Sequence, residues 1–119
     1  MDLEKEERIN AEIKRLNTIY TKIPPKKKKI LDGLIKRAAY MRVMLEDYEK
    51  DILENGAWEF FTQSDKVEPY ERERPVARLY NSMNKNYQSI IKQMGDYIKD
   101  EQPKEKKDEF MDFVMEKVE

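Results

Sequence analysis

Apolar residues recur at alternating steps of three and four along three long segments of the chain. Such spacing predicts amphipathic α-helices with one buried side. The most regular segment runs from Ile23 to Gly56, with two prolines suited to the first turn of a helix and a glycine suited to its end. We expect a single helix here of roughly 30 residues, about 45 Å long. Ile30 and Ile35 widen its apolar pattern into a stripe that needs more than one partner helix. The pattern itself consists of Leu31, Leu34, Ala38, Met41, Leu45, Tyr48 and Ile52.

Two more helices flank this one in the sequence. Residues 2–22 predict a first helix, which ends before Ile23 because a residue that precedes proline prefers an extended conformation. Residues 75–99 predict a third helix that a proline opens. A short fourth helix is expected after Pro103, where it either docks on a surface or stays mobile. The apolar positions of the first and third helices are Ile9, Ile13, Leu16, Tyr20 and Ile23, and Val76, Tyr80, Met83, Tyr87, Ile90, Met94 and Tyr97.

Residues 57–74, between the long helix and the third helix, are rich in aromatic side chains. They predict either a short β-hairpin or an extended arm. So much aromatic surface does not suit a free loop, so we expect it to pack on the helices of its own subunit or on another subunit. Together with the helical patterns, it favours a homo-oligomer larger than a dimer, a closed ring. The residues expected at the subunit interface are Trp58, Phe60, Phe61, Tyr70, Met41, Leu45, Tyr48 and Tyr87.

The fold class that follows is all-α: a long helical hairpin plus a further long helix, with the aromatic arm or short β-hairpin between them. Composition agrees with this class. Charged residues make up 41% of the chain and apolar residues 39%, with only three glycines and five prolines, a balance that favours long amphipathic helices over a β or α/β domain.

A net charge of −1 hides two segments of opposite charge. Residues 22–42 hold eight basic residues and one acidic residue, a net of +7, whereas residues 46–73 hold three basic and ten acidic residues, a net of −7. Four of the lysines fall in the first turn of the long helix, where the helix dipole disfavours each cation by about 0.3–1 kcal/mol. Helix stability therefore does not explain them.

A helix N-terminus with added lysines is suited to bind an anion, and phosphate is the usual one. The alternative interpretation is a solvated basic patch that offsets the acidic faces of the helices. The candidate contacts to DNA phosphates are Lys22, Lys26, Lys27, Lys28, Lys29, Lys36 and Arg37, and the second choice is Arg74, Arg78, Lys85 and Lys92 near the third helix.

The composition also argues against an enzyme. The chain has no Cys, which excludes disulfides and thiolate metal sites, and no His, the commonest general base and metal ligand. Its three glycines lie far apart and form no phosphate-binding loop. We therefore expect no catalytic residue, no metal and no cofactor. No apolar run reaches transmembrane length and no signal peptide is evident, so we expect a soluble intracellular protein without a membrane partner.

The order of these features resembles the small subunit of tailed-bacteriophage terminases, particularly those of phages of Gram-positive hosts. The resemblance rests on IPPKKKKILDGLIKRAAYMRVMLEDYEKDILENG at residues 23–56, the aromatic arm, and YERERPVARLYNSMNKNYQSIIKQM at residues 70–94. It covers roughly residues 7–98. Many small terminases begin with a recognisable helix-turn-helix, and residues 1–24 show no clear one. The resemblance therefore leaves open which surface meets DNA.

The resemblance implies a ring-forming, non-enzymatic DNA-packaging protein of the host cytoplasm. Such a protein recognises double-stranded viral DNA and regulates a separate large subunit, which holds the ATPase and the nuclease. Residues 1–100 would form the helical oligomerisation and DNA-recognition domain, and residues 101–119 a C-terminal partner-binding segment. Phe110, Phe113 and Val114 would contact the large subunit, unless this segment docks on its own subunit. The alternative function is a helical scaffold or adaptor that binds only proteins.

Overall fold

The structure of this protein, a computed structural model, describes residues 2–99. They form α1 (Leu3–Ile19), α2 (Pro25–Asn55), β1 (Trp58–Phe61), β2 (Tyr70–Glu73) and α3 (Pro75–Lys99), in this order. The two strands pair antiparallel, so the segment between α2 and α3 is a β-hairpin. The mostly helical fold is thereby confirmed, with a hairpin as the arm. The expected fourth helix lies outside the described residues.

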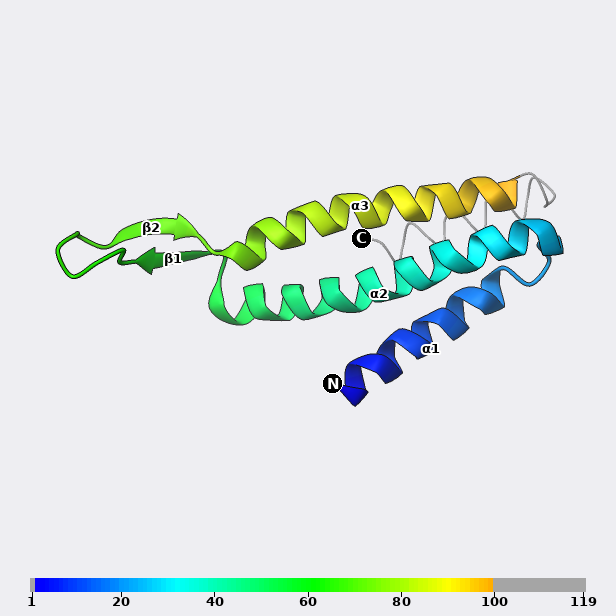
Figure 1. Ribbon diagram of the computed structural model, residues 1–119, viewed down its shortest axis with the longest axis horizontal. Helices are drawn as coiled ribbons and strands as arrows, with labels where there is room; N and C mark the ends of the chain where they lie inside the picture. The colour runs from blue at the N-terminus through cyan, green and yellow to red at the C-terminus, as the bar shows by residue number, and fades with distance from the viewer. Residues whose placement is uncertain (1, 100–119) are drawn as a thin grey trace.

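α2 is the central element and packs against both of the other helices (Figure 1). α3 runs antiparallel to α2 and lies beside it along most of its length, while α1 folds back from the start of α2 towards its middle (Figure 1). The prediction that the apolar stripe of this helix needs more than one partner is therefore confirmed. None of the helices formed by residues 2–99 combines the length and the apolar composition needed to cross a membrane.

Local sequence signals place both ends of α2. Pro24 precedes another proline and has extended backbone angles (φ −57°, ψ 147°), and the helix begins at Pro25. Gly56 follows the last helical residue with a φ of +82°, a value that side-chain-bearing residues rarely adopt. Its N–H donates to the carbonyl oxygen of Ile52 at 2.7 Å, which satisfies one of the last carbonyls of the helix.

α1 is shorter than the expected helix of residues 2–22. The Asp2 carboxylate caps its start by accepting a hydrogen bond from the N–H of Lys5 at 3.2 Å. The helix ends at Ile19, because Tyr20 leaves the helical conformation (φ −102°, ψ 35°). The turn that follows carries Tyr20 and Ile23 into the core, where both are buried.

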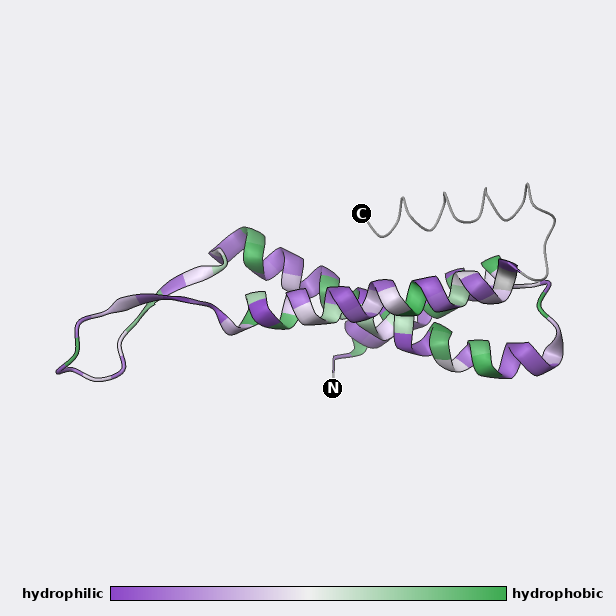
Figure 2. Ribbon diagram, turned by 90° about the horizontal axis from the view of Figure 1, so that it is seen from above, coloured by the Kyte–Doolittle hydropathy of each residue, from purple (hydrophilic) through white to green (hydrophobic). Residues whose placement is uncertain are grey.

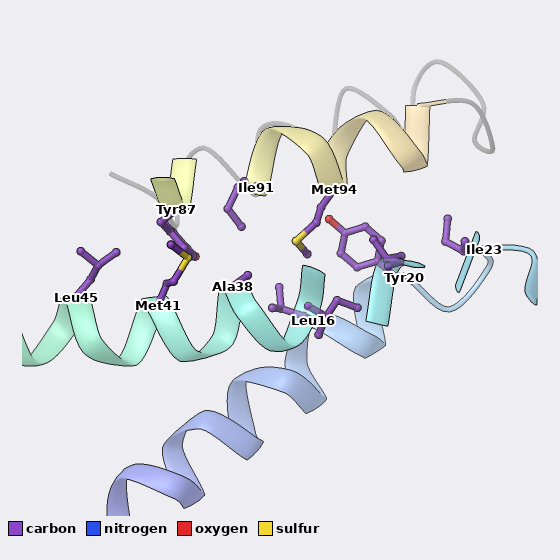
Figure 3. Close-up of a cluster of buried hydrophobic side chains, with 11 residues drawn as sticks. Leu16, Tyr20, Ile23, Ala38, Met41, Leu45, Tyr87, Ile91 and Met94 are labelled. Atoms are coloured by element: carbon purple, nitrogen blue, oxygen red, sulfur yellow. The ribbon is translucent and has the colours of Figure 1, made fainter. Parts of the chain in front are cut away.

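The core contains a cluster of buried apolar side chains between the three helices (Figure 3). Ile35 belongs to it and is 1% exposed, but Ile30 is 58% exposed, so the predicted stripe is wrong at that position. Successive helical residues are about 100° apart, and Ile30 therefore points well away from its buried neighbour Leu31. The cluster consists of Leu16, Tyr20, Ile23, Leu31, Ile35, Ala38, Met41, Leu45, Tyr87, Ile91 and Met94.

The β-hairpin leaves the helical body at the end of α2 and projects beyond it. Both views show it extending away from the helices rather than folding back on them (Figures 1 and 2). A clamp of hydrogen bonds holds its base. The N–H of Arg74 donates to the carbonyl of Ala57 at 2.7 Å, and the Arg74 guanidinium donates to the carbonyl of Gly56 at 2.7 Å and to Asp51 at 2.9 Å.

Candidate nucleic-acid and protein interfaces

The candidate phosphate contacts gather where α2 begins, at the opposite end of the molecule from the hairpin (Figure 1). We name Lys22 and the lysines at 26–29 the lysine tip. The first turn of α2 contains no acidic residue, and no side chain caps it. The positive end of the helix dipole and the lysine charges therefore reinforce each other, which is the electrostatic setting in which helix N-termini bind anions.

The lysines of the tip differ in exposure and in their contacts. Lys22, Lys26 and Lys29 are exposed and form no ion pair with any residue between 2 and 99. Lys28 instead donates from Nζ to the carbonyl oxygen of Tyr20 at 3.3 Å. This bond places a positive charge at the C-terminal end of α1, whose own last turn has no basic residue. Lys28 is thus a structural link between two helices.

Lys27 lies beside an open hollow of about 350 Å³ between the start of α2 and the end of α3. Gln93, Asp96 and Tyr97 line the other side of it. Because the hollow contains a carboxylate as well as an ammonium group, it offers no purely positive site for a phosphate. The exposed lysines of the tip are the better candidates.

The other predicted phosphate contacts differ in how free they are. Lys36 and Arg37 are exposed two to three turns further along α2. Lys85 and Lys92 are exposed on α3, whereas Arg74 is committed to the base of the hairpin. Arg78 is exposed and its Nε lies 3.7 Å from a carboxylate oxygen of Glu73. Exposed positive charge is therefore less concentrated on the second-choice surface near α3 than on the lysine tip.

The acidic half of α2 is bound to cations of the same chain. Arg8 of α1 donates to Asp47 at 2.7 Å and to Glu46 at 3.0 Å, and Lys5 lies 3.1 Å from Asp47. Partial burial raises the pKa of Asp47, but the hydrogen bonds from Arg8 and Lys5 outweigh it and leave this pKa below its usual value. These pairs join α1 to the middle of α2.

Two tyrosines of α3 extend the same polar network. The Tyr80 hydroxyl donates to Glu49 at 3.0 Å, and the Tyr87 hydroxyl accepts a hydrogen bond from Arg42 at 3.3 Å. Burial raises the pKa of both hydroxyls, and near Tyr87 the bond from Arg42 opposes this effect. Both tyrosines are therefore neutral at physiological pH and serve as links between α2 and α3.

The two faces of the hairpin differ in the contacts that their side chains form with each other. Residues directly opposite each other in an antiparallel pair share a face, so Glu59, Arg72, Phe61 and Tyr70 lie together. Arg72 forms a 2.7 Å ion pair with Glu59 and stacks its guanidinium 3.5 Å from the centre of the Phe61 ring. Phe61 also meets Tyr70 edge to face at 5.9 Å. We name this the closed face.

The open face of the hairpin consists of the other paired residues, Trp58 with Glu73 and Phe60 with Glu71. Trp58 is 61% exposed and Phe60 is 75% exposed. Neither ring has an aromatic or cation–π contact within residues 2–99. Large aromatic side chains that lie in solvent are typical of a surface that another molecule covers.

The residues predicted for the subunit interface thus fall into three groups. Met41, Leu45 and Tyr87 are buried by contacts within the chain. Tyr48 and Phe61 are half-buried, and Trp58, Phe60 and Tyr70 are exposed on the hairpin. The predicted contacts to a large subunit, Phe110, Phe113 and Val114, lie outside the described residues.

Sequence reasoning missed the structural roles of Lys28, Arg8 and Arg74. A four-lysine run gives no signal that one member caps a neighbouring helix. Arg8 and Asp47 are 39 positions apart, and only the folded chain brings them together. The one available signal was Arg74, which directly precedes the proline that opens α3 and so sits at the junction with the hairpin.

Neither the geometry nor comparison with known proteins adds a catalytic assignment. Within residues 2–99, no three acidic side chains come together in a way that could hold a metal ion. Comparison with protein-family models, curated proteins and solved structures finds no match to this chain.

Proposed function

We propose that this chain is the small subunit of a phage terminase. It is a non-enzymatic homo-oligomer, larger than a dimer, that binds double-stranded viral DNA in the host cytoplasm and regulates the large ATPase and nuclease subunit during genome packaging. The observation that carries the proposal is the lysine tip, whose exposed members Lys22, Lys26 and Lys29 have no ion-pair partner within residues 2–99. The order of helix, aromatic hairpin and proline-started helix supports it through the resemblance described above.

The chemistry of the tip suits the backbone of DNA rather than its bases. Lysine ammonium groups and the N-terminus of a helix bind phosphate without reading sequence. Each phosphate that a lysine neutralises releases condensed counterions, which makes affinity depend steeply on salt. Lys36 and Arg37 extend the positive potential along α2. In an oligomer, several tips would act on one duplex and raise the affinity further.

Regulation of the large subunit is assigned to residues 101–119. We propose Phe110, Phe113 and Val114 as its contacts, with the segment acting as an amphipathic anchor. Deleting residues 103–119 should leave DNA affinity unchanged and abolish stimulation of the large subunit's ATPase. A truncated chain that stimulates normally would remove this part of the proposal.

Salt-dependent binding to a labelled duplex tests the DNA-binding function directly. We expect the affinity of the wild-type chain to fall steeply between about 50 and 200 mM salt. The triple variant Lys22→Ala, Lys26→Ala, Lys29→Ala should bind all sequences more weakly. Its log–log slope should be flatter by roughly 0.9 for each phosphate that is no longer neutralised. The matched control is Lys85→Ala with Lys92→Ala, which removes exposed positive charge from α3 and should change little.

Two results would contradict this assignment. A triple variant with unchanged affinity and slope would remove the tip from the DNA surface. A control variant that weakens binding more than the triple variant would move that surface to α3.

The open face of the hairpin supports a second candidate, a helical scaffold or adaptor that binds only proteins. Exposed Trp58 and Phe60 are residue types that carry binding energy in protein interfaces. This alternative predicts no salt-dependent binding to any duplex, so the same titration separates the two functions.

A further inference from the structure

One side of the first half of α2 is exposed and mixes apolar and basic residues. Positions 30, 33, 36, 37 and 40 follow one another at helical spacing and lie on the side facing away from the core. Ile30 is 58% exposed and Tyr40 is 47% exposed. We name this surface the α2 stripe; its members are Ile30, Gly33, Lys36, Arg37 and Tyr40.

Gly33 is the member that the fold itself does not explain. It lies in the interior of α2, where glycine weakens a helix relative to alanine. A Cβ atom built at this position would meet nothing within 4 Å, so no neighbour in the chain requires its absence. A glycine on an exposed helix surface is suited to the close approach of another molecule.

The open face of the hairpin complements the α2 stripe in both charge and polarity. It offers the two aromatic rings of Trp58 and Phe60 beside the carboxylates of Glu71 and Glu73. The stripe offers apolar side chains beside Lys36 and Arg37. Docking the two surfaces would bury the aromatic rings against the exposed backbone at Gly33. It would also bring opposite charges together, and Arg37 would be placed to stack on a ring.

The hairpin cannot reach the stripe of its own chain. Tyr40 is fifteen residues before the end of α2, about 22 Å along the helix. The hairpin starts at that end and projects in the opposite direction (Figures 1 and 2). Two open faces also do not suit each other, because pairing them would bring Glu71 and Glu73 of both copies into one interface. The complementary surface is therefore the stripe of a second copy.

We propose that the open face of the hairpin docks on the α2 stripe of a second copy of this chain, head to tail. The inference rests on the self-association proposed above and names the two surfaces that produce it. Since the two surfaces differ, each copy still presents one free surface of each kind, and the contact repeats until a ring closes. Lys36 and Arg37 then serve assembly, and the lysine tip remains for phosphate.

Two variants with complementary defects test this arrangement by light scattering after size-exclusion chromatography. The hairpin variant carries Trp58→Ser and Phe60→Ser, and the stripe variant carries Lys36→Glu and Arg37→Glu. Each variant alone should remain a 14.4 kDa monomer, because neither can form the contact with itself. An equimolar mixture should give a complex of one copy of each, with twice that mass, because the only intact pair of surfaces is used once.

The control is Lys85→Glu with Lys92→Glu, which reverses the same amount of charge on α3 and should assemble like the wild-type chain. Circular dichroism of each variant should retain the wild-type helix content, since all these side chains are exposed. A gain of mass in the mixture would itself show that both variants are folded.

The proposal is overturned if either variant assembles like the wild-type chain, or if the mixture stays monomeric. A hairpin variant of wild-type mass that has lost binding to a different protein would assign the open face to that protein instead. A monomeric wild-type chain would overturn this inference together with self-association. The salt titration with DNA is independent of these masses, so it reports separately on the lysine tip.

Discussion

The two halves of α2 carry opposite charge and use it differently. In the second half, carboxylates are bonded to cations of α1 and of the junction before α3. In the first half, Lys26, Lys29, Lys36 and Arg37 are exposed and form no ion pair with the part of the chain between residues 2 and 99. The bonded carboxylates are Glu46, Asp47 and Asp51.

This difference separates charge that stabilises the fold from charge that is left for a partner. In the acidic half, Glu46 and Asp47 hold α1 and Asp51 holds the base of the hairpin, so these three carboxylates are already paired with cations within the chain. In the basic half, the lysines near the helix N-terminus oppose the helix dipole and lower helix stability, and Lys28 caps α1. The exposed cations of this half concentrate positive charge that an external polyanion or an acidic surface of another copy would compensate.

The largest expected effect is a loss of stability when a buried residue of the basic half is changed, compared with a change at an exposed residue of the same half. Leu31 is fully buried, and Leu31→Ala should lower the free energy of unfolding by about 2–5 kcal/mol because it leaves a cavity. Lys29→Ala, two positions away on the exposed side, should change it by less than about 0.5 kcal/mol. Urea denaturation at one fixed protein concentration measures both. Equal losses would mean that the exposed lysine also supports the fold.

The next effect concerns the ion pairs that join α1 to the acidic half of α2. Arg8→Ala removes two charge-assisted hydrogen bonds and should cost about 1 kcal/mol, a modest figure because the pairs are partly open to solvent. Hydrogen exchange should increase throughout α1. The control Lys14→Ala, at an exposed position of the same helix, should leave exchange unchanged. DNA affinity should be the same for both variants. A loss of affinity confined to Arg8→Ala would show that these ion pairs also serve DNA binding.

Gly33→Ala should stabilise the folded chain by about 0.5–1 kcal/mol, since the added methyl group meets no neighbour and alanine favours the helix. The thermal midpoint is best compared in the monomeric hairpin variant, where only folding is measured. Gly56→Ala is the contrasting change, because the φ of +82° there would strain any side chain, and it should destabilise. A destabilising Gly33→Ala would reveal an unseen constraint on α2.

The smallest expected effect is acid sensitivity. The pKa of Asp47 is lowered in the folded chain. Its contribution to the free energy of unfolding is therefore fully present above the pKa of an unfolded Asp, about 3.9. That contribution should disappear as pH falls through the lower, folded value. Asp47→Asn should remove this part of the pH dependence of unfolding. An unchanged acid profile would mean that other carboxylates control it.

Sequence reasoning placed those features of the fold that depend on neighbouring residues. The start of α2 after Pro24, its end at Gly56 and the start of α3 at Pro75 all follow from backbone restrictions that act locally. The end of α1 was placed too late, because Tyr20 leaves the helix in order to enter a core formed by distant residues. Tertiary packing decides such a boundary, and no local signal marks it.

The candidate sites show the same division. The basic concentration at the lysine tip is visible in the sequence, but the distinction between Lys28, which caps α1, and the exposed Lys29 depends on a bond to Tyr20. Likewise, the sequence allows a β-hairpin with aromatic residues as one of two alternatives, but it does not give the strand register. The register places Phe61 in aromatic and cation–π contacts, whereas Phe60 has no such contact within residues 2–99. The outer surface of α2 was not anticipated, because its residues look like the ordinary solvent side of a helix.

The central claim is that the exposed lysines of the tip, Lys22, Lys26 and Lys29, bind phosphate, while the cations paired with the acidic half are committed to the fold. Lysine acetylation with and without duplex DNA, read by mass spectrometry, tests it most directly. DNA should protect Lys22, Lys26 and Lys29, whereas Lys5, which is paired with Asp47, should react equally in both samples. Equal acetylation of the tip with and without DNA, or protection of Lys85 and Lys92 instead, would contradict the claim.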